Sequence, residues 1–94
     1  MTKAELVNEI AKKTGIERAS VLRTVEAFMD TVTNALANDE NVYLRGFGSF
    51  VVKHRAQKVA RNISKDIPMI VPAHNFPAFK PSKTLAEKVK KNHK

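Results

Sequence analysis

The chain has 94 residues, of which 43% are hydrophobic and 28% charged, and this predicts one folded domain rather than a disordered segment. Its formal net charge of +8 at pH 7 indicates an acidic partner. It has no cysteine, which excludes disulfides and fits a reducing cytoplasm. We expect neither a signal peptide nor a membrane span, because the first residues mix charged with apolar side chains and no apolar run approaches the roughly 20 residues that span a bilayer.

The first predicted element is a helix over residues 3–14. Thr2 and Glu5 have the spacing of a capping box, in which each side chain satisfies a free backbone donor of the other residue. Gly15 is a natural stop, and two lysines occupy the last turn, where the helix dipole favours cations. The apolar residues follow the helical period: Leu6, Val7, Ile10 and Ala11.

A second helix is predicted over residues 18–37, and residues 38–41 have the composition of a turn. The apolar stripe of this helix predicts an ordinary core, and the same stripe serves a shared core if two subunits associate. Its members are Val21, Val25, Phe28, Met29, Val32 and Leu36.

The period then changes from helical to alternating. Residues 42–44 and 50–52 are prone to form strands, and they flank a segment with two glycines, Gly46 and Gly48. These glycines have the wrong spacing for a phosphate-binding loop, and a strand rather than a helix follows them. They indicate a tight turn or a close approach of the backbone.

Residues 53–71 are predicted to form a two-stranded ribbon with its tip near residues 62–66. Pro68 and Pro72 lack an amide donor, so we expect them at an open edge of the ribbon. An isolated ribbon of this kind is marginal in water. After the chain returns, Ser82 is expected to cap a last helix over residues 83–91, with Leu85 and Val89 facing inward.

The charge is distributed unevenly along the chain. Residues 1–40 hold five Lys and Arg against seven Asp and Glu, whereas residues 41–94 hold twelve against two. Residues 41–65 contain no acidic side chain. Such a single-sign field attracts polyanions, which could be nucleic acid, an anionic membrane or an acidic protein.

Catalytic and metal-binding patterns are not evident. The three histidines are far apart, and none has a second ligand at the spacing of a metal site. His54 lies between two cations in sequence, Lys53 and Arg55, which disfavours metal binding. The acidic residues are mostly at capping or i, i+4 positions of the two helices, typical of a solvated face. We therefore expect neither an enzyme nor a metal or organic cofactor.

Several blocks of the sequence resemble the HU/IHF family of bacterial histone-like DNA-binding proteins, and more closely HU. They occur in the family's order and spacing: residues 46–50 (GFGSF), 55–56 (RA), 61–62 (RN) and 77–81 (PAFKP). The resemblance covers essentially the whole chain. It implies an α+β fold in an intertwined dimer, with a helical dimerisation part (1–41), a short antiparallel sheet with a long β-ribbon arm (42–81), and a C-terminal helix with a basic tail (82–94).

The resemblance also implies which residues meet DNA and which form the dimer core. The expected DNA-binding set is Lys3, Arg45, Gly46, Gly48, Lys53, Arg55, Lys58, Arg61, Asn62, Ile63, Lys65, Lys80, Ser82 and Lys83. The expected dimer core is Phe28, Val32, Leu36, Leu44, Phe47, Phe50 and Phe79.

The sequence departs from the family at the predicted ribbon tip. Ile63 stands where the family usually has the proline that wedges between base pairs, and Asp66 and Ala60 stand where it usually has glycine. Isoleucine is also an apolar wedge residue, but it lacks the rigid ring of proline. We therefore expect DNA binding to persist with a changed depth of insertion.

The predicted function is that of an architectural protein of the cytoplasmic nucleoid. It is expected to bind double-stranded DNA largely without sequence specificity, to bend it through the minor groove, and to favour bent, nicked or gapped forms. The chain is expected to form a homodimer or a heterodimer, and not to bind membranes. The alternatives are a sequence-preferring bender of the IHF type and a basic RNA-binding protein. The absence of aromatic residues from 51 to 75 favours a duplex groove over single strands.

Overall fold

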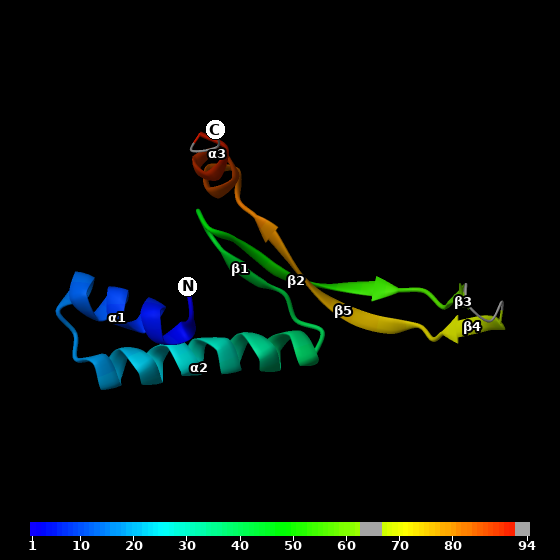
Figure 1. Cartoon of the computed structure of the whole chain (residues 1–94), viewed down its shortest axis with the longest axis horizontal. Coiled ribbons are helices and arrows are strands. Elements are labelled where there is room, and N and C mark those ends of the chain that lie inside the picture. The colour runs from blue at the N-terminus through cyan, green and yellow to red at the C-terminus, as the bar shows by residue number, and fades with distance from the viewer. Residues whose placement is uncertain (63–66, 92–94) are drawn as a thin grey trace. The chain divides into compact units, whose positions relative to one another are not determined.

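The computed structural model describes residues 1–62 and 67–91, and it has the predicted α+β fold (Figure 1). The chain divides into two compact units, residues 1–35 and 36–94. Its elements in chain order are α1 (Lys3–Thr14), α2 (Arg18–Ala37), β1 (Val42–Leu44), β2 (Gly48–Arg55), β3 (Lys58–Asn62), β4 (Ile67–Val71), β5 (His74–Pro81) and α3 (Lys83–Lys91).

Helix α1 begins and ends where its capping residues predict. The Glu5 amide donates to Thr2 Oγ1 at 3.3 Å, and Thr2 Oγ1 in turn donates to Glu5 Oε1 at 3.2 Å. At the other end Gly15 has a φ of 73°, and its amide donates to the Ala11 carbonyl oxygen at 2.9 Å. This left-handed residue stops the helix because glycine adopts it without steric cost.

The first unit buries little apolar surface. Of the residues that the structure describes, the buried hydrophobic ones are Val7 of α1 and Val21 of α2. Phe28 and Met29, farther along the stripe of α2, are 45% and 44% exposed. The stripe is therefore not a complete core within one chain. An apolar groove of about 400 Å³ lies on the two helices, lined by Leu6, Ile10, Ile16, Val21, Thr24, Val25 and Phe28.

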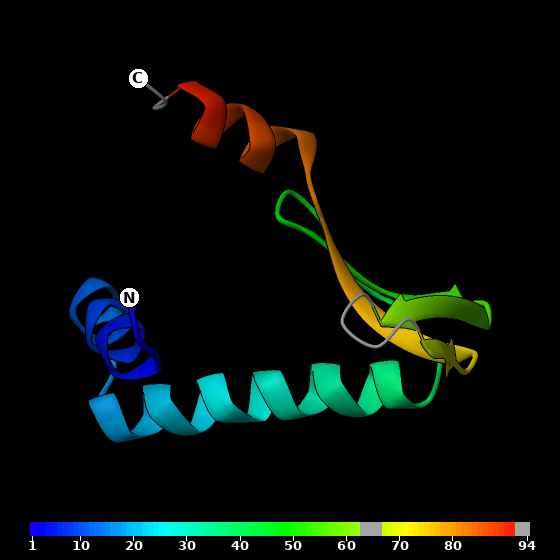
Figure 2. The same cartoon turned by 45° about the vertical axis from the view of Figure 1, so that its right-hand side comes forward.

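The three-stranded antiparallel sheet has the order β1-β2-β5 and lies in the second unit (Figure 2). Strands β2 and β5 pair along their whole length, from Gly48 opposite Pro81 to Arg55 opposite His74. Strand β5 is at the edge, a position that tolerates prolines.

Strands β3 and β4 form a separate two-stranded ribbon, in which Lys58 pairs with Val71 and Asn62 with Ile67. The predicted ribbon from residue 53 was wrong in one respect, because residues 53–55 belong to the three-stranded sheet. The two ladders are separated at residues 56–57 and 72–73, where Pro72 has no amide to donate. The predicted tip residues 63–66 lie outside the described residues.

The turn after α2 is tied to the sheet by side chains. Asp39 has a φ of 60°, and Asn41 Oδ1 accepts a hydrogen bond from the Val52 amide at 3.0 Å. His54 lies with its Nε2 3.6 Å from Asp39 Oδ1 and its Nδ1 2.6 Å from Asn75 Oδ1. The expectation of cationic surroundings for His54 was therefore wrong: an acidic residue lies beside it, because neighbours in a strand point to opposite faces.

Helix α3 begins at the predicted cap, since the Leu85 amide donates to Ser82 Oγ at 3.0 Å. Leu85 is partly buried, as predicted, but Val89 is 65% exposed. The inward placement of Val89 was therefore wrong within a single chain, because helical periodicity indicates a face without showing what covers it.

Candidate nucleic-acid interface

The register of β2 and β5 divides their side chains between two faces, because successive residues of a strand point to opposite sides. We call one the cation face: Ser49, Val51, Lys53 and Arg55 of β2 with His74, Phe76, Ala78 and Lys80 of β5. The other, the aromatic face, carries Phe50, Val52 and His54 of β2 with Asn75, Pro77 and Phe79 of β5.

The aromatic face is held together by ring contacts. The centroids of Phe50 and Phe79 are 5.0 Å apart, and those of Phe47 and Phe79 are 5.3 Å apart, with the rings tilted by 46° and 49°. Tilted pairs at this spacing attract because the positive ring edge meets a negative ring face. Phe47 and Phe79 are nevertheless 48% and 39% exposed, so this cluster is incompletely covered in one chain.

Gly48 is required by packing against the aromatic face. A Cβ atom at this position would lie 2.5 Å from Cζ of Phe79 and 2.6 Å from the carbonyl oxygen of Lys80. Gly48 lies in β2 rather than in the turn, so its close approach is to its own β5 strand. The sequence predicted a close approach of the backbone here, and the structure identifies the protein segment that is approached.

The turn between β1 and β2 depends on Gly46 and Ser82. Gly46 has a φ of 82°, and the Phe47 amide donates to the Leu44 carbonyl oxygen at 2.9 Å. Ser82 Oγ donates to the Gly46 carbonyl oxygen at 3.0 Å, and the Ser82 amide donates to the Phe47 carbonyl oxygen at 2.9 Å. Ser82 therefore fastens the start of α3 to this turn in addition to capping the helix.

The charged side chains of the cation face are all positive. Lys53, Arg55 and Lys80 are all exposed on it, and neither β2 nor β5 contains an acidic residue. The strands therefore place no carboxylate among these cations. A surface of one sign with no internal neutralisation attracts polyanions and raises their rate of encounter.

The other predicted DNA-binding residues are distributed over the chain. Arg45 is exposed in the β1–β2 turn, Lys83 is exposed at the start of α3, and Lys58 is exposed in β3. Arg61 and Asn62 are also in β3, where their backbones pair with Pro68 and Ile67. Ile63 and Lys65 lie outside the described residues.

Lys3 belongs to the first unit and already has a partner there. Its Nζ lies 3.0 Å from Oε2 of Glu26, and both side chains are about half exposed (49% and 51%). An exposed pair of this kind contributes little to stability, so a stronger anion can compete for the lysine.

Two members of the cation face that sequence analysis did not predict, His74 and Phe76, lie beside Arg55 and Lys53. The Arg55 guanidinium lies over the Phe76 ring, with Cζ 5.3 Å from the ring centroid. His74 Nδ1 lies 3.0 Å from the Pro72 carbonyl oxygen, which can only accept, so this bond places a proton on Nδ1. The pairing register would have revealed both residues, because it places them opposite Arg55 and Lys53.

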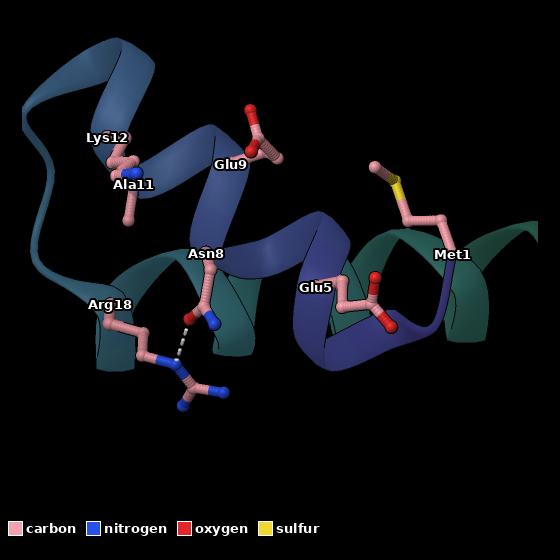
Figure 3. A pocket seen from close by; sticks show the side chains of 7 residues that line it. All are labelled: Met1, Glu5, Asn8, Glu9, Ala11, Lys12 and Arg18. Atoms are coloured by element: carbon pink, nitrogen blue, oxygen red, sulfur yellow. Dashed lines mark hydrogen bonds between the residues drawn. The ribbon is translucent and has the colours of Figure 1, made fainter.

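A hollow of about 640 Å³ along α1, bordered by Arg18 at the start of α2, is the main alternative location for a site (Figure 3). Its lining includes two carboxylates, of Glu5 and Glu9, but Glu5 is engaged by the Thr2 cap. Arg18 Nε donates to Asn8 Oδ1 at 2.6 Å, which joins the start of α2 to α1. The hollow is therefore explained by a helix junction.

The described part of the chain offers no metal site. Within residues 1–62 and 67–91, no three His, Asp or Glu side chains gather as a metal ion requires. None of the described helices is long and apolar enough to cross a membrane.

The fold and its cation face define a small basic α+β protein with a surface suited to a polyanion. Residues 1–90 match the family model of bacterial DNA-binding proteins. DNA-binding protein HU of Geobacillus stearothermophilus is 40% identical over 90 residues, covering 96% of this chain and 100% of that one. HU of Thermotoga maritima is 41% identical with the same coverage. The chain belongs to the HU family of bacterial DNA-binding proteins, as the resemblance predicted.

Solved structures agree with this assignment. The structure of Anabaena HU in a cocrystal with DNA matches with a TM-score of 0.89 and 34% identity, over 95% of this chain and 97% of that one. HU from Thermotoga maritima matches with a TM-score of 0.67 and 34% identity, over 95% and 98% of the two chains.

Proposed function

We propose that this chain is a non-catalytic architectural protein of the nucleoid that holds double-stranded DNA on its cation face and bends it. The observation that carries the proposal is the row of exposed cations on β2 and β5, on strands that contribute no carboxylate. Membership of the HU family and similarity to an HU chain crystallised with DNA support the same partner.

Phosphate neutralisation supplies most of the affinity of such a surface. Each lysine or arginine that meets a phosphate releases condensed counterions, and this gain is independent of sequence. Arg61, Asn62 and the predicted wedge Ile63 would act in the minor groove, where the base-edge code is degenerate. Recognition there depends on how easily the duplex deforms, so little sequence specificity is expected.

Bending by an apolar wedge costs a few kcal/mol for each unstacked base step. DNA that is already bent, nicked or gapped avoids part of this cost, so it should bind more tightly than intact linear duplex. Equal affinities for nicked and intact DNA at one salt concentration would argue against a wedge.

The functional form is proposed to be a dimer, specifically a homodimer. Its predicted core has the half-exposed Phe28, Phe47 and Phe79, and an apolar groove lies on α1 and α2. The other predicted members, Val32, Leu36, Leu44 and Phe50, are only partly buried in one chain. A chain of this size with so few buried side chains gains stability by covering such surfaces with a second copy. Sedimentation at several protein concentrations tests this, and a folded monomer at all of them would overturn it.

The proposed function is tested by fluorescence transfer between the two ends of a short duplex as protein is added. The wild-type chain should raise the transfer, and the rise should weaken with salt. A Lys53→Gln/Arg55→Gln double variant should bind and bend less. Lys12→Gln/Lys13→Gln is the matched control, because it removes two charges from the last turn of α1 in the other unit.

The result separates three outcomes. Loss of bending in the β2 variant alone supports the cation face as the DNA site. Equal losses in both variants would mean that net charge alone drives binding. Binding without any rise in transfer would indicate a coating protein rather than a bender.

An Ile63→Ala variant should keep most of the binding and bend less.

The alternative partners are tested by competition. Matched RNA duplexes and single strands should displace the bound DNA poorly if a DNA duplex is the partner. A panel of unrelated DNA duplexes should bind within a narrow range of affinity, whereas a strong preference for one of them would indicate an IHF-type protein.

A further inference from the structure

Phe76 has a different environment from the other phenylalanines on the sheet. Phe50 and Phe79 contact each other on the aromatic face, whereas Phe76 lies on the cation face and is 46% exposed. Its ring lies against the Arg55 guanidinium, whose Cζ is 5.3 Å from the ring centroid. The contacts of the aromatic face therefore do not involve this ring, which meets a cation instead.

The pairing register explains how the two side chains meet. Phe76 is directly opposite Lys53, and Arg55 is directly opposite His74. Arg55 therefore reaches diagonally along the face, by one pair, to cover the Phe76 ring. The separation is within the roughly 6 Å over which a cation is attracted to an aromatic face.

The contact with the ring leaves N–H donors of the Arg55 guanidinium available. The guanidinium has five N–H donors arranged as a planar fork, and one ring whose centroid lies 5.3 Å from Cζ cannot engage all of them. A phosphate binds in that plane by a bidentate contact. The same arginine can therefore stack on Phe76 and bind a phosphate.

An unstacked arginine at this position would be poorly ordered. Arg55 is the last residue of β2, is exposed, and precedes the interruption of the ladder at residues 56–57. Long side chains of this type lose rotamer freedom when they bind, which reduces affinity. A ring that already restricts the guanidinium removes part of that loss.

We propose that Phe76 is a positioning residue that holds the Arg55 guanidinium over its ring, ready to bind a phosphate of double-stranded DNA. The proposal rests on the proposed DNA-binding function and adds a role to a residue that carries no charge. Arg55 supplies the phosphate contact, and Phe76 acts only through Arg55.

The central variant is Phe76→Leu, which keeps an apolar side chain but removes the ring. The affinity for duplex DNA should fall by about two- to tenfold for each Arg55–Phe76 pair that contacts the DNA. The dependence of affinity on salt should stay unchanged, because Arg55 keeps its charge. Arg55→Gln should weaken binding and also lower the salt slope by about 0.9 for each phosphate that is no longer neutralised.

Three controls separate positioning from a merely structural role. Phe76→Tyr should restore wild-type affinity, because it keeps the ring. In an Arg55→Gln background, Phe76→Leu should have no further effect. Tyr43→Leu removes another exposed ring from the same side of the sheet, on β1 opposite Ser49, and should weaken binding less than Phe76→Leu does, because it is Phe76 that lies against Arg55. Circular dichroism of each variant shows whether it folds.

A readout without DNA tests the stack itself. In the free protein the Cδ protons of Arg55 should show an upfield ring-current shift by NMR, and Phe76→Leu should abolish it. Absence of this shift in the folded wild-type chain would overturn the proposal.

The binding outcomes distinguish this inference from the proposed function. If the wild-type chain binds and bends DNA but Phe76→Leu binds equally well, positioning by Phe76 is wrong and the function stands. An undiminished Phe76→Leu effect in the Arg55→Gln background would also overturn positioning. If the wild-type chain does not bind duplex DNA, the proposed function itself fails.

Discussion

The two faces of the β2–β5 pair are made by the same strands but have opposite properties. On the aromatic face, the Phe50 and Phe79 rings meet at 5.0 Å, and Phe79 also closes over Gly48 without room for a methyl group. On the cation face, Lys53, Arg55 and Lys80 are exposed, and Arg55 lies over the Phe76 ring. Alternation along a strand thus lets one segment support the fold and bind a ligand. Substitutions on the aromatic face and its turn should lower stability, whereas those on the cation face should lower binding.

The largest loss of stability is expected for Gly48→Ala. The added methyl group would meet both the Phe79 ring and the backbone oxygen of Lys80, and the backbone cannot move aside without breaking the β2–β5 ladder. The free energy of unfolding should fall by about 3 kcal/mol. Thermal unfolding at a fixed protein concentration measures it, and a change below about 1 kcal/mol would show that β5 shifts easily.

Ser82→Ala should have the next largest effect. The variant loses the cap of α3 and the hydrogen bond from Ser82 Oγ to the Gly46 carbonyl oxygen. We expect a loss of about 1 to 2 kcal/mol in the free energy of unfolding. Thr2→Ala is the matched control at the cap of α1, which has no tie to the turn. Equal losses for both variants would mean that the hydrogen bond from Ser82 to Gly46 adds nothing to stability beyond the helix cap.

Gly46→Ala should cost about 1 kcal/mol, because its φ of 82° is unfavourable for a residue with a side chain. Space is not the cause, since a Cβ atom at Gly46 would have no neighbour within 4 Å. The comparison with Gly48→Ala in chemical denaturation separates backbone strain from steric overlap. A larger loss of stability for Gly46→Ala than for Gly48→Ala would mean that backbone strain at Gly46 costs more than steric overlap at Gly48, contrary to this prediction.

The smallest effect on stability is expected for Lys53→Gln/Lys80→Gln on the cation face. Both residues are exposed, so the free energy of unfolding should change by at most about 0.5 kcal/mol. Affinity for duplex DNA should nevertheless fall. The slope of log affinity against log salt concentration should become shallower by about 0.9 for each phosphate that no longer meets a lysine. Titrations at several salt concentrations measure this. A destabilised variant with unchanged affinity would contradict the division between the two faces.

The helices could be predicted closely because their boundaries are encoded locally. Thr2, Gly15 and Ser82 act within a few residues of the ends that they define, and all three helices have the predicted bounds. Strand pairing could be predicted less well, because it joins residues that are far apart along the chain. The sequence showed strand-forming segments but not that residues 53–55 belong to the sheet.

The cations of the candidate site were predicted through the resemblance to the HU/IHF family, and Phe76, an uncharged member of the same face, was missed. Lys53, Arg55 and Lys80 stand out in the sequence as cations, and the register places them on one face. Phe76 resembles any core phenylalanine until its register is known, because its face depends on which residue of β2 it pairs with. His54 was misjudged for the same reason, since its sequence neighbours point away and Asp39 lies beside it.

The prolines of β5 have a consequence for how the sheet meets other molecules. The Val52 amide donates to Asn41, so it points away from β5, and its pairing partner Pro77 likewise has its nitrogen on the outer edge. By the same alternation the outer edge consists of the backbones of Asn75, Pro77, Phe79 and Pro81. Two of these four positions have no N–H, so a foreign strand finds only a broken row of donors along β5. This edge is thereby protected against runaway strand addition of the kind that leads to fibrils.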